Sequence, residues 1–356
     1  MAATFIPYQL RLSPALCWIL PVLLTGIISC KKDFTSGQFI DDKLVVLAEI
    51  TAVDSVKVPI GKTIKVGGGG IIRFEKVNDA SVILTEANAR SWILQPNWSP
   101  IYASNPTSVF TNRRRLKAAT AYSIEIKHLT LGTATATTTI PALPHVSIMD
   151  TLAVEHQGKN TLAVDFKIQD DSATANYYII EAVKETVKLL RYFYFRNVRY
   201  DYDTPQGKDV YDQNHNTYHL TILRDTIPLG KFTRIYMYTN DANTDNADID
   251  NLQNPFRRIF FDATSIKGQT YITRVFVDRQ YFTTTDLTQR GRVRVQFKAV
   301  SKELYDYLLA YEKYKTEFGS LPAGQLNIPN GNIHNGLGVF GGSARRERIM
   351  YFDVLK

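Results

Sequence analysis

The segment Leu162-Ala163-Val164-Asp165-Phe166-Lys167-Ile168 decides the fold class of this chain. Its large apolar residues occupy every second position, which is the pattern of a β-strand with one face toward a core. The same period recurs in a later segment, where the apolar positions are Val293, Val295 and Phe297 and the polar ones Arg292, Arg294, Gln296 and Lys298. The sequence therefore predicts a mostly β protein.

The region before residue 143 repeats this alternation in shorter segments. One predicted strand carries Leu44, Val46, Ala48 and Ile50 on a single face, and another carries Tyr122, Ile124 and Ile126. Short strands separated by turns, with no helical stretch among them, predict an immunoglobulin- or fibronectin-like β-sandwich over residues 43–143. The proline-containing segment 140–144 is the predicted boundary, and residues 144–356 are expected to form a larger β-rich domain.

One principal helix is predicted, over residues 301–318. Ser301 is a suitable N-cap and Glu303 lies in the first turn. Apolar and aromatic residues then form one stripe at helical spacing: Leu304, Tyr307, Leu308, Tyr311 and Tyr314. Such a stripe favours packing against a sheet over binding a ligand. Elsewhere the pattern predicts strands at Thr217–Leu223 and, last in the chain, near Ile349–Val354.

The first 29 residues have the features of a lipoprotein signal peptide. Arg11 precedes an apolar run, Ala15 to Ile28, that is shorter than the roughly 20 residues of a bilayer-spanning helix. The run ends in Ile27-Ile28-Ser29-Cys30, which resembles the lipobox of bacterial lipoproteins. Cys17 lies inside the run, so cleavage leaves Cys30 as the single cysteine, unable to form an internal disulfide. A plain secretory signal with an incidental cysteine is the alternative.

Residues 30–42 are expected to form a lipidated tether, because they are polar and contain Gly and Ser. Lys31-Lys32-Asp33 follows the cysteine directly and resembles the surface-export signal of Bacteroidota lipoproteins. These features predict a lipid-anchored protein of the outer membrane, at the cell surface; a solvated tether without an export signal is the alternative.

The chain carries a formal net charge of +8. Its basic clusters, at 113–115, 257–258 and 345–348, are not interleaved with stacking aromatic residues in the manner of a nucleic-acid-binding motif. We expect no nucleic acid as partner. For a surface protein the nearest polyanion is lipopolysaccharide.

Several segments resemble one known family. They are Leu44-Val45-Val46, the junction PALPHVSIMD at 141–150, Asn176-Tyr177-Tyr178, Ser301-Lys302-Glu303-Leu304-Tyr305 and the run NIHNGLGVFGG at 332–342. Together with the string before Cys30, they resemble the Bacteroidota lipoprotein family catalogued as domain of unknown function 4249. The most specific part is a C-terminal motif: Asn332, Gly336, Gly338, Phe340 and Gly341.

The resemblance implies no catalytic residues, because the family has no established activity. Its members are often encoded beside TonB-dependent transporters, which implies a possible outer-membrane β-barrel as partner. The ligand is not implied by the resemblance.

Two segments match the letters of binding motifs, but the structure predicted around them does not suit those motifs. Residues 336–341 spell G-x-G-x-x-G, yet a dinucleotide site needs that turn between a strand and a helix, and here Arg-rich sequence follows. We expect these glycines to allow positive φ or close packing instead. His215 and His219 give H-x-x-x-H, but on the predicted strand they would lie roughly 13 Å apart, too far to share a zinc ion.

The polar segment 240–250 is a candidate calcium loop. Asp241, Asn243 and Asp245 match the first three ligand positions of an EF-hand. Asn246 stands where glycine is preferred and Leu252 where the bidentate glutamate belongs. A polar loop with Asx turns is therefore the favoured interpretation, and no other cofactor is expected.

The leading hypothesis is a surface-anchored, non-catalytic binding or accessory module working with a TonB-dependent transporter. The alternative is a surface glycan-binding protein or hydrolase partner, whose two carboxylates the sequence does not identify. The expected contact surface comprises Gly336–Gly342 and the loop 240–256, presented at one end of the second domain.

Overall fold

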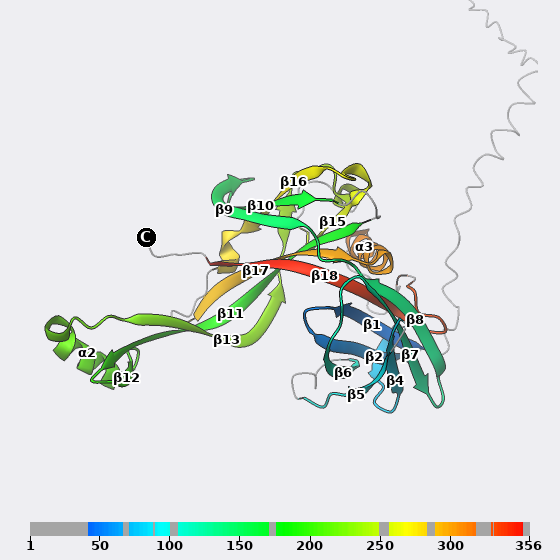
Figure 1. Ribbon diagram of the computed structural model, residues 1–356, viewed down its shortest axis with the longest axis horizontal. Helices are drawn as coiled ribbons and strands as arrows, with labels where there is room; N and C mark the ends of the chain where they lie inside the picture. Colours follow the sequence, from blue (N-terminus) through cyan, green and yellow to red (C-terminus); the bar gives the residue numbers. More distant parts are fainter. Residues whose placement is uncertain are drawn as a thin grey trace, which may run out of the picture. The chain divides into compact units, whose positions relative to one another are not determined.

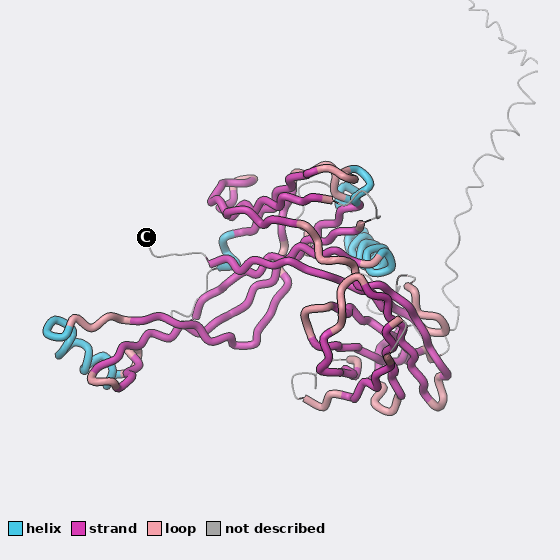
Figure 2. Tube along the Cα trace, in the orientation of Figure 1, coloured by secondary structure: helices cyan, strands magenta, loops and turns pink. Residues whose placement is uncertain are grey.

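The computed structural model describes residues 42–66, 71–87, 90–99, 106–170, 176–248, 256–282, 289–317, 329 and 331–351. The predicted signal peptide, Cys30 and nearly all of the predicted tether lie outside these residues. The described part is mostly β, as predicted, with two α-helices (Figure 1, Figure 2).

The strands are β1 Leu44–Thr51, β2 Ser55–Val66, β3 Ile71–Lys76, β4 Ser81–Glu86, β5 Ser91–Pro96, β6 Ser108–Arg115, β7 Thr120–His128, β8 Gly132–Ile140, β9 Val146–His156, β10 Lys159–Gln169, β11 Tyr177–Phe195, β12 Val198–Asp201, β13 Leu223–Arg234, β14 Met237–Thr239, β15 Arg258–Asp262, β16 Thr270–Asp278, β17 Gln289–Val300 and β18 Leu337–Tyr351. The helices are α2 Pro205–Tyr218 and α3 Lys302–Glu317, with 3-10 turns η2 Asp245–Asp248, η3 Ala263–Ser265 and η4 Arg279–Phe282.

One large sheet joins the two predicted domains. Its main path runs β12-β11-β17-β18-β1-β2-β6-β5-β4-β7-β8, and a second sheet has the order β14-β16-β10-β9. Among the described strands, the pairing of β1 with β18 is the only parallel one, from Val45 opposite Leu337 to Thr51 opposite Ser343. The first and last described strands of the chain are therefore neighbours.

Two hydrophobic cores lie on either side of this pairing. The first is built mainly from β1–β8, which is consistent with the sandwich-like arrangement expected there. It is completed by Ile333, Phe340 and Ala344 from the end of the chain. The second is built from β10, β11, β14–β17 and α3, and it takes Val339 and Met350 from β18. Strand β18 thus contributes to both cores, so the predicted boundary near residue 143 is crossed by a shared strand.

The helix α3 confirms the helix predicted at 301–318, with slightly shorter bounds. Ser301 ties its start to β18, because the Ser301 hydroxyl accepts a hydrogen bond from Gly342 N at 3.2 Å. The last strand, β18, begins at Leu337, twelve residues before the predicted start at Ile349.

The prediction of a strand at 217–223 was wrong, because a second α-helix that the sequence analysis did not predict ends in this segment. Helix α2 ends at Tyr218, and His219 follows it in the left-handed conformation, with φ of 49°. Thr204 caps the helix and Pro205 occupies its first turn, which is a recognised start pattern. The helix was missed because it has no apolar stripe: Gly207 is its one buried residue.

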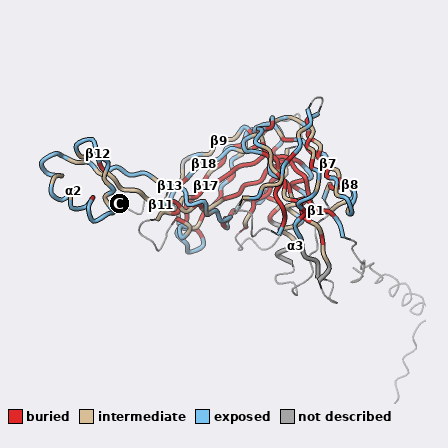
Figure 3. Tube along the Cα trace, turned by 90° about the horizontal axis from the view of Figure 1, so that it is seen from below, coloured by how far each residue is buried: buried red, intermediate tan, exposed pale blue. Residues whose placement is uncertain are grey.

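The far end of β11 forms an arm, defined here as residues 189–226. Strand β17 pairs with β11 as far as Lys188, and beyond it β11 pairs with β12 and β13. Figure 1 shows the arm ending in β12 and α2, and Figure 3 shows it mostly exposed or intermediate. Its own small core centres on Phe193, whose ring lies 5.2 Å from that of Tyr211 in α2.

Candidate functional site

The helix α3 lies over the β1–β18 pair and forms one wall of a cavity. Leu304 and Tyr307 are buried in the second core, as expected for a stripe that packs on a sheet. One turn further along α3, Leu308 and Tyr311 are only partly buried. All four side chains line the cavity, so the stripe both packs on the core and forms the cavity wall.

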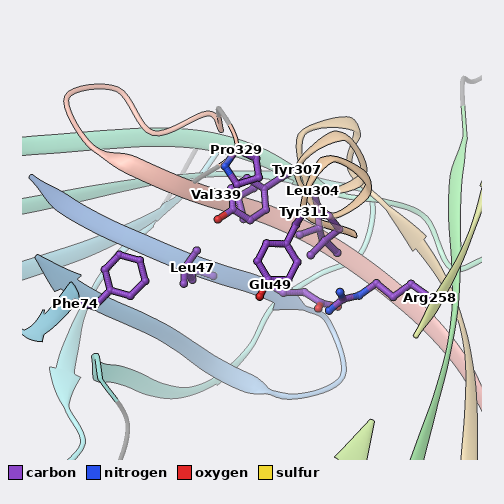
Figure 4. A pocket seen from close by; sticks show the side chains of 11 residues that line it. Leu47, Glu49, Phe74, Arg258, Leu304, Tyr307, Tyr311, Pro329 and Val339 are labelled. Carbon is purple, nitrogen blue, oxygen red and sulfur yellow. The ribbon is translucent and has the colours of Figure 1, made fainter. Parts of the chain in front are cut away.

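The cavity has a volume of about 300 Å³. Its lining comprises Leu47, Ala48, Glu49, Phe74, Arg258, Leu304, Tyr307, Leu308, Tyr311, Pro329 and Val339. Figure 4 shows the rings of Tyr307 and Tyr311 facing Leu47 and Glu49 of β1, with Arg258 at one end. The walls are therefore apolar and aromatic, with charged groups confined to one end.

An ion-pair network forms that charged end. Glu181 of β11 is 2% exposed and lies 2.6 Å from Arg258 Nε and 2.8 Å from Lys298 Nζ. Lys298 Nζ also lies 2.9 Å from Glu49 Oε1, and Arg258 Nη1 lies 2.5 Å from Glu312 Oε1.

Two further groups complete the network. Arg234 approaches Glu181 at 3.3 Å, and the Ser343 hydroxyl donates to Glu49 at 2.7 Å. Three carboxylates thus face three cations, and their formal charges cancel.

The network keeps Glu181 and Glu49 ionised. Burial alone would raise the pKa of Glu181, but the charges of Lys298, Arg234 and Arg258 outweigh it and lower that pKa. Burial would also raise the pKa of Glu49, but the charge of Lys298 and the hydrogen bonds from Ser343 and Lys298 together lower it. Lys298 is the converse case: Glu181 and Glu49 outweigh burial and raise its pKa.

Tyr307 behaves differently, because burial raises the pKa of its hydroxyl to about 12. It therefore stays a neutral phenol at physiological pH. Together these groups supply fixed charges and a neutral hydroxyl, and the two carboxylates with lowered pKa are poor proton donors near neutral pH.

The C-terminal motif lies next to this cavity and has a structural role. Gly338 has a φ of +97°, and a Cβ there would lie 2.1 Å from Val46 O. At Gly341 a Cβ would lie 2.4 Å from the Cβ of Leu304. The expectation that these glycines allow positive φ or close packing is confirmed.

The rest of the motif fixes the same strand. Asn332 donates to Phe340 O and to Thr137 O, both at 2.8 Å, and its own oxygen accepts from Phe340 N. Gly336 packs beside Leu44 O, where a Cβ would lie at 3.0 Å. The expectation that Gly336–Gly342 is a contact surface was wrong, because residues 338–342 are buried within β18. A G-x-G-x-x-G turn between a strand and a helix is equally absent there, since Gly338 and Gly341 belong to β18 and Gly336 lies in a bend directly before it.

The candidate calcium ligands are engaged by tyrosines. Asp241 accepts a hydrogen bond from the Tyr271 hydroxyl at 2.5 Å and from Asn243 N at 3.0 Å, which is an Asx turn. The Asn243 amide donates to the same Tyr271 oxygen, and Asp245 accepts from Tyr305 in α3. Residues 249–255, including Asp250 and Leu252, lie outside the described part. Calcium binding by Asp241, Asn243 and Asp245 stays a prediction.

The histidine pair is arranged differently from the prediction. His215 lies in α2 and stacks on Tyr211 at 4.9 Å, and its Nδ1 lies 3.0 Å from Tyr211 O. Within the part of the chain that the structure describes, no three His, Cys, Asp or Glu side chains are grouped to hold a metal ion. In the same part, no helix is both long and apolar enough to cross a membrane.

A family model described as Domain of unknown function (DUF4249) matches residues 32–349. The chain belongs to this family. The match spans β1 through most of β18, so it includes the cavity, the ion-pair network and the C-terminal motif of this DUF4249 chain. No curated protein matches it.

Two solved structures show a weak likeness to this DUF4249 protein. One describes manganese lipoxygenase of Gaeumannomyces graminis with a partial zonadhesin of Komagataella pastoris, at 9% identity and a TM-score of 0.17, covering 87% of this chain and 93% of the other. The second is a putative carbohydrate binding protein from Bacteroides uniformis, at 7% identity and a TM-score of 0.12, covering 87% and 98%. At these TM-scores neither likeness bears on fold or function.

Sequence reasoning missed the ion-pair network of this DUF4249 chain. Its members come from β1, β11, β13, β15, β17, β18 and α3, so no local spacing connects them. A usable indication was present in two places: Glu181 interrupts the apolar run YYIIEAV, and Lys298 interrupts VQFKAV. A charge inside a buried strand needs a partner, which predicts that such residues meet in the fold.

Proposed function

We propose that this chain is a lipid-anchored, non-catalytic binding module of a bacterial outer membrane, held through Cys30 and acting beside a TonB-dependent transporter. The observation that carries the binding role is the cavity under α3, whose lining carboxylate Glu49 lies in an ion pair, as do Glu181 and Glu312 in the network behind it. A general acid must carry a proton at working pH, and the lowered pKa of Glu49 and Glu181 opposes this.

The anchor and the location are supported by the sequence. The string Ile27-Ile28-Ser29-Cys30 precedes a polar segment, and the chain belongs to the DUF4249 family. A surface position in Bacteroidota and the transporter partner follow from the resemblance stated above. The polar composition of residues 30–42 supports a tether between the proposed anchor and the folded part.

The anchor is tested by Cys30→Ala in cells supplied with a labelled fatty acid. The variant is expected to lose the label and to leave the membrane fraction, while Cys17→Ala, in the predicted signal peptide, retains both. Unchanged labelling of Cys30→Ala would refute the anchor.

The binding role is tested by blocking the cavity. Leu308→Trp fills the space beside Tyr311, whereas Leu152→Trp adds the same ring at a 58% exposed position on β9. Leu308→Trp is expected to impair uptake or surface assembly as strongly as deletion of the gene, with Leu152→Trp close to wild type. Co-isolation of an outer-membrane β-barrel with the native lipoprotein is expected as well.

A catalytic role would give a different result. If the purified protein cleaved a polysaccharide or peptide unaided, and one carboxylate substitution abolished turnover, the binding role would be wrong and the hydrolase alternative would stand.

A further inference from the structure

The walls of the cavity favour an apolar ligand. Apart from the charged end they are formed by aliphatic and aromatic side chains, including Leu47, Leu308 and Phe74. Burying apolar groups of a ligand against such walls is favourable, and a volume of about 300 Å³ is at the lower end of the range for small-molecule sites. The space suits a ring or a short chain rather than a large molecule.

The charged end disfavours an ionic ligand. Glu49, Glu181 and Glu312 are matched by Lys298, Arg258 and Arg234, and each takes part in at least one ion pair. An entering anion or cation would lose its hydration without finding an unpaired counter-charge. The cancelling charges therefore select against ions of either sign.

Tyr307 supplies a neutral polar group to the cavity. Its side chain is 7% exposed and lines the cavity, and its hydroxyl makes no hydrogen bond with another described residue. A ligand that covers this hydroxyl would shield it from water, and a hydroxyl or amide on the ligand would then satisfy it, because a hydroxyl buried without a partner is costly. Burial keeps that hydroxyl protonated, so it can both donate and accept.

We propose that the cavity binds an uncharged aromatic or aliphatic group that carries one neutral hydrogen-bonding substituent, and that it discriminates against ions. This rests on the proposed function in one respect, namely that the cavity under α3 is a binding site. It adds the chemical class of the ligand.

Three probes of one shape test the proposal with the full mature chain. They are 2-naphthol, which is neutral, 2-naphthoate, which is an anion, and 2-naphthylmethylammonium, which is a cation; binding is measured by calorimetry. We expect 2-naphthol to bind, and each ion to bind at least roughly tenfold more weakly. Leu308→Trp is expected to abolish binding of 2-naphthol, and Leu152→Trp to leave it unchanged.

A charge substitution sharpens the test. Glu49→Gln removes one carboxylate from the network and leaves Lys298 in excess, so binding of 2-naphthoate relative to 2-naphthol is expected to rise roughly fivefold. The matched control is Glu125→Gln, which removes an exposed carboxylate paired with Lys127 on β7, and its ratio is expected to stay at the wild-type value. Glu312→Gln supplies the same measurement if Glu49→Gln does not fold.

The outcomes separate the two proposals. If a charged probe binds wild type more tightly than 2-naphthol and Leu308→Trp abolishes that binding, the ligand class is wrong while the binding site stands. If no probe binds, or if Leu308→Trp leaves binding unchanged, both the ligand class and the cavity as binding site are refuted. The charge-based selection would also be refuted if binding of 2-naphthoate relative to 2-naphthol were the same in Glu49→Gln and in Glu312→Gln as in wild type.

Discussion

Strand β18 and the arm hold their positions by opposite means. Gly338 of β18 contacts Val46, Gly341 contacts Leu304 and Gly342 contacts Thr139, so its close contacts join segments far apart in the sequence. In the arm, Tyr211 contacts both Phe193 and Tyr202, within a span of 19 residues. In β18 the close contacts are possible because glycine has no side chain. In the arm the contacts are made by large aromatic side chains. Damage to β18 should therefore spread to both cores, whereas damage to the arm should stay local.

The largest effect is expected from Gly338→Ala. The new Cβ would lie 2.1 Å from Val46 O, and the φ of +97° is unfavourable for any L side chain. We expect the free energy of unfolding, measured by urea denaturation, to fall by about 4–5 kcal/mol. The control is Gly230→Ala, where φ is +69° but no atom lies within 4 Å of the new Cβ, and the expected loss is about 1–2 kcal/mol. Equal losses of unfolding free energy in Gly338→Ala and Gly230→Ala would show that the positive φ alone destabilises, and that the close packing of β18 on β1 makes no further contribution.

Glu181→Gln comes next, because it leaves Lys298 and Arg258 beside a neutral amide. Loss of one partner of a buried ion pair is expected to cost about 3–5 kcal/mol. The control is Asp165→Asn, which disrupts a more exposed pair with Arg274 and is expected to cost at most about 1 kcal/mol. A cost for Glu181→Gln as small as that of Asp165→Asn would refute the tight coupling across β11, β15 and β17.

The same network predicts a pH dependence. The pKa of Glu181 and that of Glu49 are lowered from 4.5 in the folded state, so their contribution to stability is complete above that pH. It is lost as the pH falls below 4.5 toward the folded-state pKa. The acid loss in unfolding free energy should be smaller in Glu181→Gln than in wild type. An identical acid profile in both proteins would contradict the assignment to Glu181.

Phe193→Ala tests the arm. Removing this fully buried ring is expected to cost about 3 kcal/mol of local stability. Hydrogen exchange should speed up in β12 and α2, while protection in β1 and β18 and the main unfolding midpoint stay near wild type. Tyr194→Ala, at a 53% exposed neighbour, is the control and should change little. A fall in the protection of β18 would show that the arm is coupled to the two cores.

The smallest effect concerns Asp241, Asn243 and Asp245. Because tyrosines already hold these side chains, we expect the melting temperature to be the same in chelator and in added calcium. A ligand bound only by the folded state raises the melting temperature, so a rise with calcium would instead assign a site to this loop. Asp241→Asn would then have to abolish the rise.

Local patterns in the sequence predicted the elements better than their partners. Alternation located β10 and β17, and a helical stripe located α3, because each pattern reports how one element faces a core. The pairing of β1 with β18 produces no local pattern in the sequence, because the periodicity of a strand does not indicate which strand pairs with it. Helix α2 was missed for a related reason: it covers a small aromatic cluster, not a large core.

The candidate site was predictable only in part. Tyr307, Leu308 and Tyr311 were found as a stripe, and their packing role was expected. The cavity itself was not predicted, because Leu47 and Glu49 reach it from the other end of the sequence. A calcium site was considered from the spacing of oxygen-bearing residues, but spacing gives no information on tyrosines from other elements that bind the same oxygens.

The parallel pairing of β1 with β18 also sets the order of events when the chain is made. Synthesis delivers β1–β8 first, while Phe340 and Ala344, which complete their core, arrive near the end. Until then, apolar surface on the early strands stays exposed, and burying it requires contacts between opposite ends of the chain. Such a protein is expected to fold late and slowly and to depend on chaperones. A chain that stops before β18 should be degraded rather than accumulate as a stable fragment.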